Sequence, residues 1–195
     1  MTDHWTRESI LEALEGLDDH LDRSLTAYLR GGGAMVLREF RDGTPDIDLI
    51  VSSPDELDRL AEAITSAGYE QIIRTEKAGA GTMCRFGDDR EREIDLFDRR
   101  VPEGLVLSEG IKHRSEHLLK LDRLTVEMLS PEDIYLRKVI HQGRMRDKPD
   151  VDALANTELD MTTISEELAT QRELVDEDLP TMLFLGGRGR GSDRR

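Results

Sequence analysis

The stretch "GGGAMVLREFRDGTPDIDLIV", Gly31 to Val51, decides how the chain is interpreted, because it joins three glycines to two aspartates on an apolar strand. The segment after Pro45 alternates polar and apolar residues and then becomes continuously apolar, which predicts an interior strand. Side chains two residues apart on a strand point to the same face, so Asp46 and Asp48 should lie side by side, with Ile47 on the other face.

Two parallel carboxylates need something to offset their repulsion. At about 4 Å and an effective dielectric constant near 20, they repel each other by roughly 4 kcal/mol. A shared proton, an arginine or a divalent cation can provide the compensation, and Mg²⁺ prefers oxygen ligands together with waters or phosphates. The pair therefore indicates half of a metal–phosphate site. In the alternative, Asp46 only follows a turn and Asp48 lies at an exposed strand end.

A third acid and the glycines extend this hypothesis. The segment "REIDLFD" places Asp95 between Ile94 and Leu96, so a strand next to the first would complete a cluster of three carboxylates able to hold two metal ions. Glu93 and Asp98 are weaker candidates because they lie nearer the charged strand ends. Glycines at a helix start let backbone N–H groups approach a phosphate, although the spacing matches neither a Walker A loop nor a dinucleotide-binding fingerprint.

The remaining sequence predicts alternating helices and strands. Helices are expected over 8–29 (its end entering a strand), 34–40, 53–69 with Ser53 as N-cap, near 108–116, and over 130–143, 147–158 and 160–175. Strands are expected over 46–53, then over 70–75, 82–89 and 90–98 as a meander, with two small strands around Asp122 and Arg123. The last residues, "GGRGRGSDRR", have no apolar face and are expected to be disordered.

The composition is strongly acidic. The 195 residues carry 42 acidic and 27 basic side chains, a net charge of −15, and only five of the basic residues are lysines. A disordered acidic chain would lack the periodic apolar segments seen here, so we expect a folded, salt-adapted (halophilic) protein with a hydrated surface. No membrane-length apolar run or signal peptide is present and Cys84 is the single cysteine, which favours a cytoplasmic protein without a membrane partner.

A glycine-rich helix start, a dozen residues and then Asp-x-Asp on a strand, with a later acid on a neighbouring strand, resembles the DNA polymerase β-like nucleotidyltransferase superfamily. The likeness is greatest to its small prokaryotic members, including those of toxin–antitoxin and abortive-infection loci. The later segment "LSPEDIYLRKVIHQGRMRDKPDVDAL", 129–154, resembles the part that follows their core. The resemblance covers about residues 25–157 and implies an α/β (α+β) fold: a mixed β-sheet flanked by helices, followed by a helical C-terminal part. We place the core with its N-terminal helix over 1–129, the helical part over 130–180 and the disordered tail over 181–195.

The resemblance also implies roles for individual residues. Gly32 and Gly33 would contact nucleotide phosphates, and Lys138 would contact the triphosphate or the acceptor. Asp46, Asp48 and Asp95 would hold Mg²⁺ or Mn²⁺, with Asp95 activating the acceptor hydroxyl. By residue type alone, Lys138 could equally snorkel from a packed helix.

Two functions follow as expectations. The first is transfer of a nucleoside monophosphate from an NTP such as ATP to a protein, RNA-end or small-molecule hydroxyl, and the acidic surface favours a protein or small-molecule acceptor over a nucleic acid. The second is a catalytically silent binding protein, such as a regulator or a toxin–antitoxin partner of a protein encoded nearby. A further cluster of charges either lines the site or ties two helices together: Arg144, Arg146, Asp147, Asp150 and Asp152.

Overall fold

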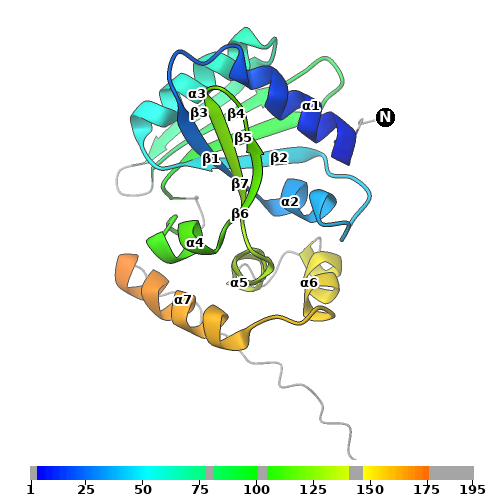
Figure 1. Cartoon of the computed structure of the whole chain (residues 1–195), viewed down its shortest axis with the longest axis vertical. Coiled ribbons are helices and arrows are strands. Elements are labelled where there is room, and N and C mark those ends of the chain that lie inside the picture. Colours follow the sequence, from blue (N-terminus) through cyan, green and yellow to red (C-terminus); the bar gives the residue numbers. More distant parts are fainter. Residues whose placement is uncertain (1–3, 78–80, 101–104, 141–146, 176–195) are drawn as a thin grey trace, which may run out of the picture.

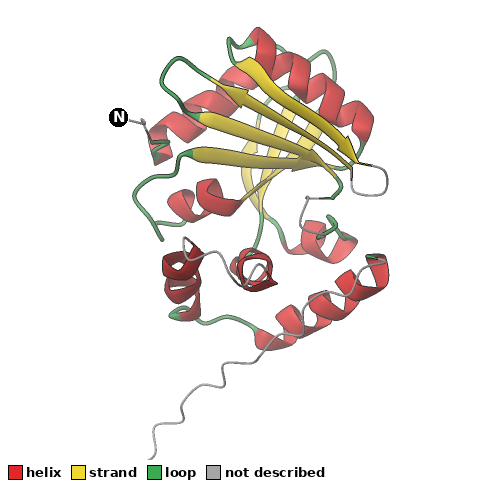
Figure 2. Cartoon of the chain, turned by 180° about the vertical axis from the view of Figure 1, so that it is seen from behind, coloured by secondary structure: helices red, strands yellow, loops and turns green. Residues whose placement is uncertain are grey.

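The computed structural model describes residues 4–77, 81–100, 105–140 and 147–175, which form one mixed sheet with helices on both sides (Figures 1 and 2). The seven strands lie in the order β3-β4-β5-β2-β1-β7-β6. They are β1 (Leu25–Arg30), β2 (Asp46–Val51), β3 (Glu70–Lys77), β4 (Gly81–Gly87), β5 (Glu93–Asp98), β6 (Glu116–Lys120) and β7 (Leu124–Met128). The helices are α1 (Arg7–Asp18), α2 (Gly31–Leu37), α3 (Pro54–Ser66), α4 (Glu109–Arg114), α5 (Pro131–Ile140), α6 (Lys148–Ala155) and α7 (Met161–Leu174). The predicted α/β class and mixed sheet are confirmed.

Alternate side chains of strand β2 point to opposite faces of the sheet. Ile47, Leu49 and Val51 are fully buried, and α3 packs against β2, β4 and β5 on this apolar side. Figures 1 and 2 show α1 beside α3 on the same side, whereas α5, α6 and α7 lie on the opposite side. The alternation of β2 thus turns Asp46 and Asp48 away from the main core and toward the C-terminal helices.

The helix expected over 8–29 occupies only the first part of that range. Helix α1 begins at the N-cap Thr6, whose hydroxyl accepts the N–H of Ser9, and it ends at Asp18. The end of the range is strand β1, in line with the expectation that the helix gives way to a strand there. Pairing explains the difference, because β1 is hydrogen-bonded to β2 on one side and to β7 on the other.

The meander and its neighbours follow the sequence closely. Strands β3, β4 and β5 pair antiparallel in chain order, and β5 then lies parallel to β2. Ser53 caps α3 through a hydrogen bond from the N–H of Glu56, with Pro54 in the first turn. The parallel contact between β2 and β5 fulfils the condition for Asp95 to join the aspartates of β2.

The three C-terminal helices begin directly after β7. Leu136, Ile140, Ile164 and Leu168 are buried there, so α5 and α7 pack through apolar side chains. The division at residue 129 stays a prediction, and the tail over 181–195 lies outside the described residues, as do Arg144 and Arg146. Within the described part of the chain, no helix is both long and apolar enough to cross a membrane.

Candidate active site

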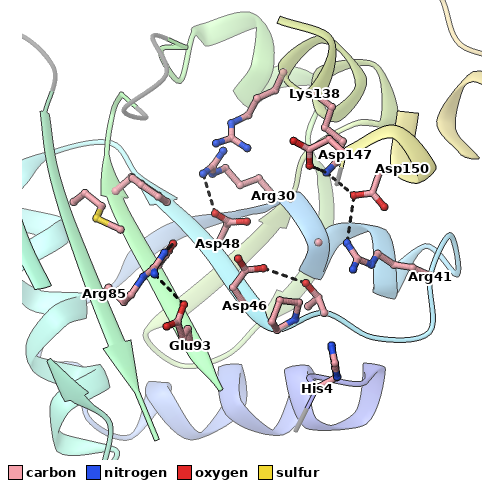
Figure 3. A pocket seen from close by; sticks show the side chains of 18 residues that line it. His4, Arg30, Arg41, Asp46, Asp48, Arg85, Glu93, Lys138, Asp147 and Asp150 are labelled. Atoms are coloured by element: carbon pink, nitrogen blue, oxygen red, sulfur yellow. Dashed lines mark hydrogen bonds and ion pairs between the residues drawn. The ribbon is translucent and has the colours of Figure 1, made fainter. Parts of the chain in front are cut away.

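Four neighbouring strands align two aspartates and two arginines across one face of the sheet. Figure 3 shows Arg30, Asp48 and Arg85 of this set. Arg30 of β1 pairs in register with Asp48 of β2, and Asp48 pairs with Asp95 of β5. Asp95 in turn pairs with Arg85 of β4. Directly paired residues point to the same face of a sheet, so Arg30, Asp48, Asp95 and Arg85 form a line across four adjacent strands that we call the charged row. Its charges run positive, negative, negative, positive.

The adjacent positions extend the acidic part of this face. Asp46 lies two residues before Asp48 and pairs in register with Glu93 of β5. On the other side of the charged row, Phe97 of β5 pairs with Met83 of β4. Three carboxylates predicted to act together, Asp46, Asp48 and Asp95, therefore do share one face and two adjacent strands.

The arginines at the ends of the row neutralise its aspartates. Arg30 Nη2 lies 2.9 Å from Asp48 Oδ1, and the Arg30 guanidinium carbon lies 4.6 Å from the centre of the Phe97 ring. Arg85 donates to both oxygens of Asp95, from Nε to Oδ1 at 2.7 Å and from Nη2 to Oδ2 at 2.8 Å. A shared proton, an arginine and a divalent cation are the three ways to offset the repulsion. The structure shows an arginine beside each of Asp48 and Asp95.

Mutual repulsion persists despite these pairs. Burial raises the pKa of Asp46, the neighbouring charge of Asp48 raises it further, and the Thr44 hydroxyl that donates to Oδ1 at 3.1 Å acts in the opposite sense. Burial also raises the pKa of Asp95, against the lowering effect of the Arg85 hydrogen bonds, while the charge of Asp48 adds to the rise. Both carboxyl groups would gain from another positive charge on this face.

The glycine triplet provides space beside the aspartates. Gly31 has a φ of 63°, and a Cβ atom at this position would overlap Asp48 Oδ2. A Cβ on Gly32 would overlap the Thr44 hydroxyl. Gly31 and Gly32 line the site cavity, whereas a Cβ on Gly33 would lie 3.1 Å from Leu29 Cδ1, on the core side. The pair that faces the cavity is thus Gly31 and Gly32, whereas the sequence analysis named Gly32 and Gly33.

The C-terminal helices close the other side of the cavity. Lys138 of α5 lies 2.6 Å from Asp150 Oδ2 and 3.3 Å from Asp147 Oδ1. Arg41, from the segment between α2 and β2, lies 3.3 Å from the same Asp150 oxygen. Both readings of this cluster hold for Asp147 and Asp150, since they line the cavity and also tie α5 to the start of α6 (Figure 3).

The cavity between sheet and helices has a volume of about 610 Å³, within the usual range for small-molecule sites. Its charged side chains are almost balanced in number, unlike those of the whole chain. The cationic ones are Arg30, Arg41, Arg85, Arg137 and Lys138, and the acidic ones are Asp46, Asp48, Glu93, Asp95, Asp147 and Asp150. A protein of net charge −15 therefore gathers five cations around one cavity, and four of them pair with the acids that line it.

The three aspartates offer the type of donor atom that a hard divalent cation binds. In this structure two of them, Asp48 and Asp95, are paired with arginines. The three aspartates supply only oxygen donors, as Mg²⁺ and Mn²⁺ prefer. Among the described residues, however, no three carboxylate, histidine or cysteine side chains converge closely enough to hold a metal ion. Asp46, Asp48 and Asp95 are the residues that would hold such an ion.

Comparison with known proteins assigns the chain to a family. A family model described as "Nucleotidyltransferase of unknown function (DUF6036)" matches residues 8–178, which is most of the chain. The chain belongs to this nucleotidyltransferase family. No protein with a curated description matches it.

Solved structures agree at the level of the fold. The antibiotic-resistance factor ANT(2'')-Ia, known from a solution structure, is 20% identical over 85% of this chain and 90% of its own, with a TM-score of 0.54. A candidate nucleotidyltransferase from Thermotoga maritima is 16% identical over 78% of this chain and 96% of its own, with a TM-score of 0.50. At these identities, the likeness establishes a shared nucleotidyltransferase fold.

In this nucleotidyltransferase, the Ser-Pro-Glu-Asp segment fixes the helix that carries Lys138. The Ser130 hydroxyl donates to Asp133 Oδ2 at 2.9 Å and accepts the Asp133 N–H. Arg114 of α4 binds Asp133 at 2.7 Å and Glu167 of α7 at 2.6 Å. Burial raises the pKa of Asp133 while the hydrogen bonds from Arg114 oppose the rise. This buried network holds α5 against α4 and α7 and so positions Lys138 over the cavity.

Several residues of the site escaped the sequence analysis. Arg30 and Arg85 belong to no recognisable motif. The only indication in the sequence is that each is a charged residue within a predicted strand or at its end. His4 also lines the cavity, next to Trp5, which exchanges two backbone hydrogen bonds with Thr44. Asp98, a weaker candidate, belongs to the opposite face of β5 and accepts the N–H of Thr82 at 2.5 Å.

Proposed function

We propose that the protein transfers a nucleoside monophosphate from an NTP to a hydroxyl group, with Mg²⁺ or Mn²⁺ held by Asp46, Asp48 and Asp95. The observation that supports this most is the placement of these three carboxylates side by side, next to two glycines, in a cavity that five cations also line. A binding scaffold gains nothing from three neighbouring acids, because each raises the cost of ionising the others.

The residues of the chain would divide the chemistry among them. Divalent ions, when bound, supply charge neutralisation at the attacking and leaving oxygens. Gly31 and Gly32 allow the phosphates to approach the backbone closely. Lys138 and Arg41 balance the charge of the triphosphate, and Asp95 accepts the proton of the attacking hydroxyl. Most of the rate gain in this scheme comes from positioning and electrostatic stabilisation.

The acceptor belongs to the same proposal. We favour a protein or small-molecule hydroxyl over a nucleic acid, because the net charge of −15 opposes a long polyanion. The shared fold with an antibiotic-resistance factor is compatible with a small-molecule acceptor. At 20% identity it does not select one.

Ligand-dependent stability tests the proposal without knowledge of the acceptor. Thermal unfolding would be followed in molar KCl with Mg²⁺ and each NTP in turn, for the wild type, Asp48→Asn and the control Asp152→Asn, which lies outside the cavity. An NTP at a hundred times its dissociation constant adds about 2.7 kcal/mol, and hence roughly 5–10 °C for a protein of this size. Wild type and Asp152→Asn should show the shift with at least one NTP, and Asp48→Asn should not. A folded wild type that responds to no NTP would rule the proposal out.

A second candidate, a silent nucleotide-binding regulator, has one observation in its favour. Arg30 and Arg85 pair with Asp48 and Asp95, so both carboxylates have a structural partner whether or not the site is catalytic. Pyrophosphate release separates the two candidates. A regulator would be stabilised by nucleotide yet release no pyrophosphate in the presence of any hydroxyl acceptor, whereas the enzyme releases it in an acceptor-dependent way.

A further inference from the structure

Arg85 occupies the carboxylate that a metal ion would need. Its Nε and Nη2 atoms hold both oxygens of Asp95, and its Nη1 atom lies 3.1 Å from Glu93 Oε2. A guanidinium bound in this two-pronged way matches a carboxylate better than any other side chain does. A divalent cation at Asp95 would face this positive charge at short range.

The two arginines of the charged row differ in their freedom to move. Arg30 is 2% exposed, is stacked on Phe97, and contacts one oxygen of Asp48, while the other oxygen lies beside Gly31. The Arg85 side chain is 31% exposed and lines the cavity from β4. Arg85 can therefore exchange its partner by rotating its own side chain, whereas movement of Arg30 would disturb the surrounding core.

We infer that Arg85 competes with divalent metal for Asp95 and releases that carboxylate only when a triphosphate enters the cavity. This inference rests on the proposed function. The triphosphate offers Arg85 new anionic partners at the moment when metal arrives to replace the guanidinium at Asp95. Metal alone offers Arg85 no such exchange, so the free protein binds metal weakly and binds metal and nucleotide together.

This competition gives Arg85 a role that a stabilising ion pair does not have. If Arg85 only stabilised Asp95, its removal would weaken the site and every ligand would bind less well. If it competes, its removal exposes three acids to one another and metal alone binds more tightly. At the same time the nucleotide loses a cationic contact. The two effects have opposite signs, which a general loss of structure cannot produce.

Mn²⁺ binding followed by the electron paramagnetic resonance signal of the free aqueous ion measures the first effect directly. We would compare the wild type, Arg85→Gln and the control Arg74→Gln, whose arginine lies on β3 outside the cavity and pairs with Asp58 at 2.8 Å. Without nucleotide, Arg85→Gln should bind Mn²⁺ at least about tenfold more tightly than the wild type, and the Mn²⁺ affinity of Arg74→Gln should equal that of the wild type. With non-hydrolysable analogues of each NTP, the wild type should gain Mn²⁺ affinity and Arg85→Gln should bind the analogue less tightly.

The outcomes separate this inference from the proposed function. Equal Mn²⁺ affinity of the free wild type and Arg85→Gln overturns the inference, even if the wild type binds Mn²⁺ with an analogue. Absence of Mn²⁺ binding in both proteins with every analogue overturns the proposed function itself. Should Arg85→Gln fail to fold, Arg85→Lys makes the same test, because an ammonium lacks the planar fork that matches both Asp95 oxygens and should leave metal affinity above that of the wild type.

Discussion

Replacement of Gly31 by alanine tests whether the glycine start and the charged row form one unit. Alanine at a φ of 63° is in the left-handed region, which costs about 1–2 kcal/mol for a residue with a Cβ atom. The new methyl would also overlap Asp48 Oδ2 and push that carboxylate away from Arg30, which is 2% exposed. Loss of one partner from a buried ion pair costs roughly 3–5 kcal/mol, so a displaced one should cost a part of this. We expect a total loss of about 2–4 kcal/mol in the free energy of unfolding.

Urea denaturation followed by tryptophan fluorescence suits this measurement, because Trp5 is the single tryptophan and is fully buried. Gly16→Ala is the matched control: a Cβ atom there meets nothing within 4 Å in helix α1, so we expect a gain of about 0.5–1 kcal/mol. Gly31→Ala should also lose the NTP-dependent stabilisation, and Gly16→Ala should keep it. If Gly31→Ala unfolds at the same urea concentration as the wild type, then the left-handed backbone and the contact with Asp48 are not what this position requires.

Three other expectations follow from the charges. Because the pKa of Asp46 is raised, the free energy of unfolding should fall as the pH rises from the ordinary value of 3.8 toward the raised one. Asp46→Asn should abolish this part of the fall, so that the variant is about 0.5–2 kcal/mol more stable than the wild type at pH 7.5 and little more stable near pH 4. A stability difference between the two proteins that is the same at both pH values would contradict this cause. Arg114→Met leaves two buried carboxylates without their shared guanidinium and should cost about 3–5 kcal/mol in urea denaturation, with partial recovery on adding Glu167→Gln. The urea midpoint should rise between 0.15 M and 2 M KCl, and equally in NaCl, because screening relieves the net charge of −15; a midpoint that falls with salt would argue against a salt-adapted surface.

The parts of the fold that could be predicted are those determined by the residue pattern of a single short segment. The alternation of "DIDLIV" predicts β2 and its two faces, and Ser53 with Pro54 predicts the start of α3. Strand β1 was harder to recognise because Leu21, Leu25 and Tyr28 continue the spacing of the preceding helix. Its strand conformation is stabilised by hydrogen bonds to β2 and β7, and residue spacing along a single segment contains no information on such distant partners.

The same distinction applies to the site. That Asp46 and Asp48 share a face is a property of one strand, and it could be derived from the period of two. The charged row needs three pairings in register between four strands, and a shift of one residue in any of them would turn a side chain to the other face. For this reason Arg30 and Arg85 were not predicted. The conformation of Gly31 was hidden in another way, since three successive glycines do not show which of them takes a positive φ.

The charged row also shows where this chain gives up stability for a site. The raised pKa values of Asp46 and Asp95 mean that the folded state holds their charges less favourably than the unfolded chain does. Directly beneath them, on the other face of the same strands, Ile47, Leu49 and Leu96 are fully buried. Each such side chain contributes about 1.5–3 kcal/mol on burial, enough to offset the cost of neighbouring carboxylates. A rigid apolar face under an unfavourable acidic one keeps the three carboxylates together, and the ion pairs of Arg30 and Arg85 reduce the repulsion between them.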